Sequence, residues 1–207
     1  MKNGWWKSGV VVFLLLGVLG GVFFCARTAD EQKSVAEDVL RLHIVANSDS
    51  DYDQKVKLEV RNRILKDCGY LFQDCQTSRE SAHVAEQQAM KIHKAAEDEL
   101  RKHGVLQPVS VRVEECRFPT KEYGTVRLPA GSYTALNVRI GTAQGKNWWC
   151  VLYPPLCLTG DAVKADEETL KKLRQTLTAE EYALVTETEE IQVHVKFKLL
   201  ELLGKWV

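Results

Sequence analysis

An unbroken apolar run near the amino terminus constrains the fold of this chain more than any other feature of its sequence. Residues 10–26 contain no charged side chain, and charged residues flank them, with Lys2 and Lys7 on the amino side. As a helix the run measures about 26 Å, slightly less than the membrane core and more than most signal-peptide cores. We therefore expect residues 1–29 to be a signal peptide or membrane anchor, with 10–26 in the cytoplasmic membrane.

The flanks of this run also predict where the rest of the chain lies. Lysines on the amino side favour a cytoplasmic amino terminus, so residues 30–207 are expected to form a single extracytoplasmic domain. Cleavage signals are weak because Phe24 and Arg27 occupy the minus-three positions of the candidate cuts, where small residues are preferred. Release after cleavage and retention as an anchored protein both remain open.

The charge balance argues against a nucleic-acid partner. Lys and Arg together number 28, as do Asp and Glu, so no overall field draws the molecule to a polyanion. A hydrophobic content of 45% is that of an ordinary folded domain. Recognition by this chain is therefore expected to be local, with no nucleic acid among its partners.

Hydrophobic periodicity predicts an α+β domain. Apolar alternation predicts strands at 39–46, 109–113, 123–128, 133–140 and 148–153, and a helical period predicts helices at 51–67, 77–103, 166–177 and 178–185. The ambiguous segment 191–206 is interpreted as a helix. No repeat or linker divides the body, so we expect helices packed on one face of a mostly antiparallel sheet.

Three predicted helices begin with residue pairs at capping-box spacing, in which a side-chain oxygen accepts from a free helix N–H. These pairs are Asp51 with Gln54, Thr77 with Glu80, and Thr178 with Glu181. Gly104 is expected to end the second helix.

Familiar catalytic and metal-binding patterns are missing from the sequence, and no catalytic, cofactor or metal residue is predicted. A calcium loop starting at Asp49 fails because Gln54 and Val60 stand where glycine and glutamate are required. The acidic turn that contains Asp49 is instead interpreted as helix capping. Contact with a partner through Asn47, Ser48 and Asp49 is the alternative.

The segment 145–157 concentrates tryptophan, proline and cysteine. Cys150 and Cys157 are candidates for a disulfide in an oxidising compartment, with buried free thiols as the alternative. Trp148 and Trp149 must face opposite sides of a strand, so we expect one in the core and the other either exposed or covering a neighbouring element. Packing of the pair in the core and at its rim is the equal alternative. The candidate partner contacts of this segment are Trp148, Trp149, Pro154 and Pro155.

Three separated motifs, taken together, resemble one known family. They are LHIVANSDS at 42–50, followed by Asp53, Gln54 and Lys57, then LPAGSYTAL at 128–136 and GKNWWCVLYPPLC at 145–157. In this order they resemble the stage II sporulation protein R family of endospore-forming Firmicutes. The resemblance spans roughly residues 40–157.

The resemblance implies a signalling ligand rather than an enzyme. Members of the family are exported from the forespore into the space between the two septal membranes. There they activate a membrane-embedded aspartic protease that processes pro-sigma-E, which makes this protease the implied partner. The alternative is an extracytoplasmic hydrolase or thiol-dependent enzyme acting on wall material, with His43, Asp49 and Cys150 as catalytic candidates. A pocket joining these three side chains would favour the enzyme.

Overall fold

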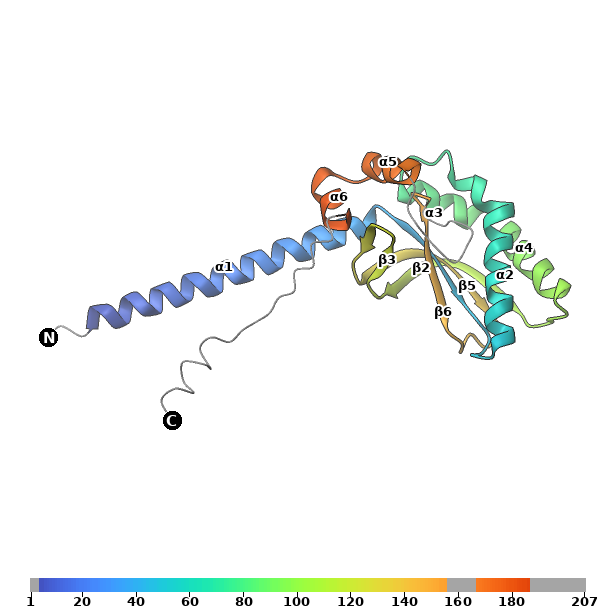
Figure 1. Cartoon of the computed structure of the whole chain (residues 1–207), viewed down its shortest axis with the longest axis horizontal. Helices are drawn as coiled ribbons and strands as arrows, with labels where there is room; N and C mark the ends of the chain where they lie inside the picture. The colour runs from blue at the N-terminus through green and yellow to red at the C-terminus, as the bar shows by residue number, and fades with distance from the viewer. Residues whose placement is uncertain (1–3, 156–166, 187–207) are drawn as a thin grey trace.

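The computed structural model describes residues 4–155 and 167–186. A long helix, α1 (Gly4–Glu37), projects from a body in which helices pack on a four-stranded sheet (Figure 1). The fold is α+β, as the sequence predicts. The segment 191–206, predicted as a helix, lies outside the described residues, as does Cys157.

The sheet is mixed rather than mostly antiparallel. Its strands lie in the order β2 (Val109–Phe118), β5 (Gly131–Ile140), β1 (Leu40–Val45) and β6 (Asn147–Tyr153). β1 runs parallel to β5, while the β2–β5 and β1–β6 pairs are antiparallel. The parallel pair arises because the helices after β1 carry the chain to the far edge of the sheet, and β5 then pairs with β2 and enters beside β1. The predicted topology is therefore only partly right.

Residues 123–128, predicted as one strand, belong to a hairpin. β3 (Lys121–Tyr123) and β4 (Val126–Leu128) pair in a separate two-stranded sheet. Gly124, with a φ of 65°, turns the chain between them in the left-handed region that glycine adopts readily. Apolar residues stand on both sides of this turn, which is why the sequence pattern merges two strands into one.

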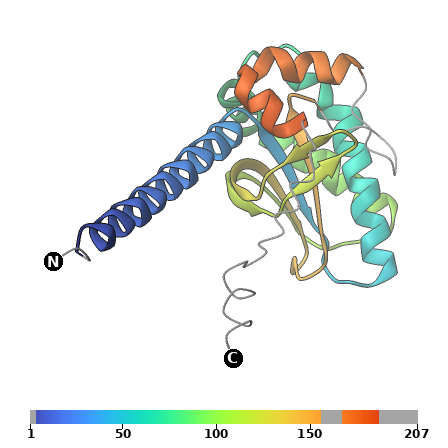
Figure 2. The same ribbon diagram turned by 60° about the vertical axis from the view of Figure 1, so that its left-hand side comes forward.

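Helices α2 (Asp51–Cys68), α3 (Ser78–Gln87) and α4 (Ala89–Lys102) lie on one side of the sheet (Figures 1 and 2). A short 3-10 helix, η1 (Gly69–Phe72), follows α2. The sequence predicts α3 and α4 as one helix, but the chain leaves helical geometry at Gln88, where φ is −98° and ψ is 9°. After β6 in the chain, α5 (Glu167–Thr176) and α6 (Ala179–Thr186) form where the sequence predicts helices.

The caps explain where the helices begin and end. Two predicted pairs form as expected: the Thr77 hydroxyl accepts from Glu80 N, and the Thr178 hydroxyl accepts from Glu181 N. For α2 the prediction is wrong, because the cap is Ser50, whose side chain accepts from the backbone N–H of Asp53. Gly104, with a φ of 71°, follows the end of α4 as predicted.

β1 is buried on its helix face, and its amino-terminal end is buried on the opposite face as well. Leu42 and Ile44 are fully buried on the helix side, where they pair with Leu136 and Val138 of β5. On the opposite face Arg41 is also fully buried, close to side chains of β2, β3 and β5. The layers that cover both sides of this end of β1 come from the fold rather than from the local pattern, and further along the strand His43 is only half-buried.

The apolar part of α1 is exposed along most of its length, and Leu14 and Phe23 are 61% and 70% exposed. The last turns of the helix join the core through Val35, which is fully buried. Among the described residues, none of the helices has both the length and the apolarity of a membrane span.

Candidate functional site

The first and third sequence motifs meet in space just after β1. The backbone N–H of Gly145 donates to the carbonyl of Ala46 at 2.9 Å, and the N–H of Lys146 donates to Asp49 Oδ1 at 2.6 Å. Residues 46–54 and 141–146, with Lys57, are called the motif junction below. Segments far apart in the sequence thus form one hydrogen-bonded unit.

Asp53 lies at the centre of the motif junction. Its Oδ2 accepts from the Ser48 hydroxyl at 2.6 Å and from Asn47 Nδ2 at 2.9 Å. These two bonds, that of Ser48 first, lower the pKa of the Asp53 carboxyl. A carboxylate in the first turn of α2 also favours the positive end of the helix dipole. Asp53 therefore ties the turn after β1 to the start of α2.

Two glycines are required by the close packing of the motif junction. The backbone N–H of Thr142 donates to Asn47 Oδ1 at 3.0 Å, and a Cβ at the neighbouring Gly141 would overlap this same oxygen. A Cβ at Gly145 would overlap the carbonyl oxygen of Ser48. Gly141 also has a φ of 59°, which side chains rarely allow.

A buried lysine completes the motif junction. Lys57 is 4% exposed, and its Nζ donates to Gln54 Oε1 at 2.6 Å and to the carbonyl of Lys146 at 2.9 Å. Gln54 in turn donates to the carbonyl of Ser48 at 2.9 Å. Burial lowers the pKa of the Lys57 ammonium. These bonds give a structural reason for the Asp53, Gln54 and Lys57 spacing of the first motif.

The three candidate contacts within the motif junction differ in exposure. Asn47 and Ser48 are half-buried, and their side chains are engaged in bonds within the protein. Asp49 is exposed, although one of its oxygens accepts from Lys146. Of these three, Asp49 is the one whose position suits contact with a partner.

The two tryptophans lie on opposite faces of β6, as the strand predicts. Trp148 pairs with Ile44 on the helix side and lies under the Arg61 guanidinium, 4.2 Å from the ring centre. Trp149 pairs with His43 on the other face, and the two rings stack with centres 6.1 Å apart. Both tryptophans pack against the core and stay partly exposed. This arrangement is the packing at the rim of the core that the sequence left open as an alternative.

The two candidate-contact prolines, Pro154 and Pro155, lie largely inside the protein. Pro154 is buried, and Pro155 is half-buried. Both line a cleft of about 170 Å³ that also involves Cys75 after η1 and Lys172 of α5. Of the two prolines, Pro155 has the more accessible side chain.

The cysteines differ in state. Cys150 is 1% exposed and disulfide-bonded, whereas Cys68, Cys75 and Cys116 are free. Since Cys157 lies outside the described residues, its pairing with Cys150 stays a prediction.

The three catalytic candidates of the enzyme alternative do not come together. Cys150 pairs with Leu42 and so shares the helix face of the sheet, whereas His43 points to the opposite face. Asp49 lies beyond the end of β1 and is bonded to Lys146. Within residues 4–155 and 167–186, no group of three or more His, Cys, Asp or Glu side chains could hold a metal ion.

The face opposite the helices carries a buried arginine that the sequence pattern does not reveal. Arg41 Nη2 donates to the Tyr123 hydroxyl at 2.8 Å, and its Nε donates to the carbonyl of Cys150 at 3.2 Å. The guanidinium carbon lies 4.3 Å from the ring centre of Phe118 and 4.9 Å from that of Tyr133. Burial lowers the pKa of Arg41 and raises the pKa of Tyr133 to about 12. An arginine within an apolar strand is the only sequence signal for this cage.

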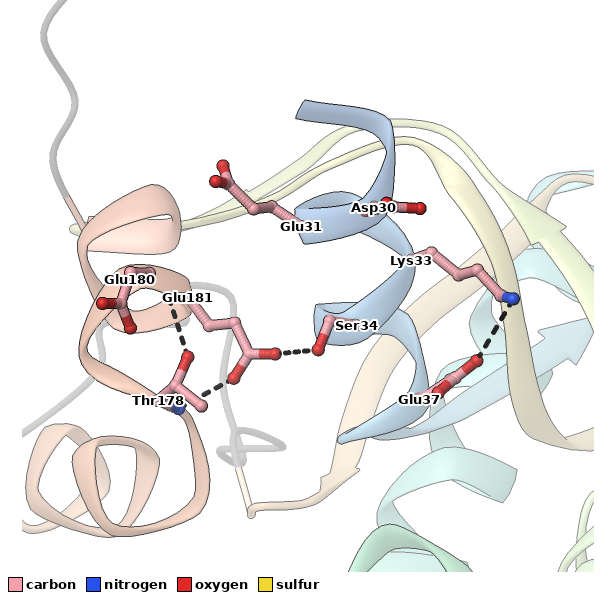
Figure 3. A pocket seen from close by; sticks show the side chains of 8 residues that line it. All are labelled: Asp30, Glu31, Lys33, Ser34, Glu37, Thr178, Glu180 and Glu181. Atoms are coloured by element: carbon pink, nitrogen blue, oxygen red, sulfur yellow. Dashed lines mark hydrogen bonds and ion pairs between the residues drawn. The ribbon is translucent and has the colours of Figure 1, made fainter. Parts of the chain in front are cut away.

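Figure 3 shows an acid-rich cleft of about 400 Å³ between α1 and α6. Its buried carboxylate, Glu181, accepts from the Ser34 hydroxyl and from the backbone N–H of Thr178, the latter at 2.7 Å. Burial and the nearby Glu181 raise the pKa of Asp38 at the base of α1. The central acid of this cleft thus holds α6 against α1.

Comparison with known proteins identifies the family. The family model described as stage II sporulation protein R matches residues 36–164. Stage II sporulation protein R of Bacillus subtilis (strain 168) is 35% identical over 211 residues, which cover 93% of each chain. The chain belongs to the stage II sporulation protein R family. No solved structure matches it.

The part matched by the stage II sporulation protein R model includes both sheets and the whole motif junction. Helices α5 and α6 lie outside it. All three motifs that carry the family resemblance therefore lie within the matched part.

Proposed function

We propose that this chain is an exported sporulation signal that activates a membrane-embedded aspartic protease and so promotes the processing of pro-sigma-E. Membership of the stage II sporulation protein R family supports a role in sporulation. The observation that carries the finer proposal is the 35% identity with the Bacillus subtilis protein over 93% of both chains.

The structure of the body is consistent with a ligand. The hydrogen bonds of the motif junction tie the end of β1 to the start of β6, so the sheet is rigid before any partner arrives, which lowers the entropic cost of binding to its surfaces. The candidate nucleophile Cys150 and the candidate base His43 lie on different faces of the sheet. A preformed surface and separated catalytic candidates favour recognition over catalysis.

The proposed location follows from the N-terminal segment. Residues 10–26 are apolar and follow lysines, a pattern typical of export. We place the chain on the route from the forespore to the space between the septal membranes, either secreted or anchored there with residues 30–207 outside the cytoplasm.

Reconstitution in a non-sporulating host tests this function. The protease and pro-sigma-E are expressed with the full chain, with a chain lacking residues 10–26, or with no chain, and conversion of pro-sigma-E is followed by immunoblotting. The full chain is expected to raise conversion at least tenfold, and the shortened chain to have little effect because it is not exported. Equal conversion with and without the full chain would contradict the proposal.

A further inference from the structure

A row of polar side chains crosses the sheet on the face opposite the helices. Asn137 of β5, His43 of β1 and Trp149 of β6 lie directly opposite one another in the strand register. Residues paired in this way have their side chains on the same face and within contact distance. Asn137, His43 and Trp149, with Arg41 two positions before His43 in β1, are called the polar row below.

Each member of the polar row has a buried atom without a hydrogen-bond partner among the described residues. These atoms are Asn137 Oδ1, His43 Nδ1, Trp149 Nε1 and Arg41 Nη1. Buried polar atoms are nearly always hydrogen-bonded, although unpaired ones also occur off this face, such as Trp148 Nε1 on the helix side and Ser81 Oγ of α3. Arg41 and Asn137 are 0% and 2% exposed, which makes them fixed parts of the fold rather than mobile surface groups. The two half-buried members, His43 and Trp149, are therefore the ones that another molecule can reach.

The unpaired atoms include both donors and acceptors. Trp149 Nε1 and Arg41 Nη1 donate, whereas Asn137 Oδ1 accepts. His43 Nε2 is bonded to Asn147 Oδ1 at 2.8 Å, so Nδ1 accepts in the neutral ring and donates in the protonated ring. Burial, its largest cause, lowers the pKa of His43. A peptide chain offers both kinds of group at once, which makes an extended segment a better match than a simple ion.

Basic side chains surround the polar row. Lys121 Nζ lies 4.8 Å from the ring centre of Trp149, and Arg112 and Arg139 are exposed on the neighbouring strands. Of the nearby acids, Glu114 is already bonded to Arg139 at 2.7 Å and to Asn137, and Glu122 beside Lys121 pairs with Arg127. The excess of positive charge favours a partner segment that carries Asp or Glu.

Part of this face is open to solvent. The β3–β4 hairpin contributes Tyr123 to the cage at Arg41, whereas Asn147 and Arg139 at the other end of the face are exposed. The rings of His43 and Trp149 are themselves only half-buried. A partner can therefore reach the rings themselves, whereas their unpaired nitrogens are buried in this structure.

We propose that the polar row and the basic side chains around it form the surface that binds an acidic, extended segment of the membrane protease on its extracytoplasmic side. This inference rests on the proposed function. It goes further by separating the docking surface from the motif junction, whose polar side chains are bonded within the protein.

Charge reversal tests the surface. Lys121→Glu is compared with Arg79→Glu, a matched reversal at an exposed position in the first turn of α3. Trp149→Phe keeps a ring and removes the indole N–H. Binding of the detergent-solubilised protease to the full chain and conversion of pro-sigma-E are both measured, with thermal unfolding as a check on folding. We expect at least tenfold weaker binding for Lys121→Glu, about threefold for Trp149→Phe, and wild-type binding for Arg79→Glu.

Photo-crosslinking provides a second readout that does not depend on stability. A photoreactive residue at position 147 is expected to crosslink to the protease, and one at position 79 is not. Folded Lys121→Glu and Trp149→Phe proteins that bind and activate like the wild type would overturn the docking surface while leaving the proposed function intact. A crosslink at position 147 to a second copy of the chain, with a dimer in solution, would overturn the assignment to the protease. Failure of the wild-type chain to raise conversion would overturn the proposed function, and the docking surface with it.

Discussion

The motif junction and the polar row are both rich in polar side chains, but they differ in how many of these side chains have hydrogen-bond partners within the protein. At the junction, Asn47, Ser48 and Asp53 bond to one another and to backbone groups. In the row, Asn137 and His43 keep unpaired buried atoms although they lie opposite each other. A satisfied network stabilises one conformation, whereas an unsatisfied one costs stability and is retained only for another reason. The difference separates a structural motif from a candidate binding surface.

The largest effect is expected at the motif junction from Gly145→Ala. A Cβ at this position overlaps the carbonyl oxygen of Ser48, so the backbone must move and break the bonds around it. We expect a loss of about 3 kcal/mol of unfolding free energy, the upper range for local backbone strain. Urea denaturation measures this loss.

Gly69→Ala is the matched control for this change. Gly69 has helical geometry, with φ −58°, and nothing lies within 4 Å of a Cβ built there. Alanine at this position is expected to be neutral or to stabilise by about 0.5 kcal/mol. Equal losses for the two variants would show that the junction is no more tightly packed than the α2 terminus.

A smaller effect is expected from Ser48→Ala, and it depends on pH. The hydroxyl of Ser48 is the largest cause of the lowered pKa of Asp53. A lowered carboxyl pKa adds stability that is present above the unfolded-state pKa, near 3.8, and is lost as the pH falls through the folded-state pKa. Ser48→Ala should therefore lose stability near neutral pH and show a shallower decline during acid titration.

Ser110→Ala, an exposed position on β2, controls for the loss of a hydroxyl. Circular dichroism between pH 2 and pH 7 compares the three proteins. A Ser48→Ala protein with the same acid titration as the wild type would show that the Ser48–Asp53 bond adds no pH-dependent stability.

The smallest change in stability is expected in the polar row from Arg41→Met. Removing Arg41 gives up contacts with Phe118 and Tyr123, but it also removes a buried charge with an unpaired Nη1. Buried ionic groups can often be replaced by apolar residues of similar volume at little cost. We expect the unfolding free energy to stay within about 1 kcal/mol of the wild type.

The same urea titration measures this variant, with Leu42→Ala on the helix face as the reference. Leu42 is fully buried, and its truncation should cost about 3 kcal/mol. An Arg41→Met protein as unstable as the Leu42→Ala protein would show that Arg41 is structurally required, and the contrast between the two polar regions would be lost.

Local patterns in the sequence determine most of the elements of this fold. The Thr178 and Glu181 pair caps α6, and Gly104 follows the end of α4, because both act on backbone groups only a few residues away. Alternation likewise locates β1, β5 and β6. The alternation errs at residues 123–128, where Gly124 divides one predicted strand into two.

The sequence predicts less of the candidate site than of the fold. The sequence singles out Asn47, Ser48 and Trp149, and the structure places the first two in the motif junction and the third in the polar row. Asn137 and Arg41 carry no sequence signal beyond an isolated polar residue in an apolar strand. Their importance depends on the neighbours that each acquires on folding.

The sequence by itself determined the family, the α+β class and the starts of several helices, because motifs, alternation and capping pairs are each legible within short stretches of the chain. Only the tertiary structure decided that β5 enters the sheet beside β1 and in parallel with it. This arrangement places Asn137 opposite His43, and the neighbouring β6 places Trp149 on the other side. Strand order and the burial of Arg41 follow from long-range packing, whose free energy depends on the whole assembled sheet and leaves no periodic trace in the sequence.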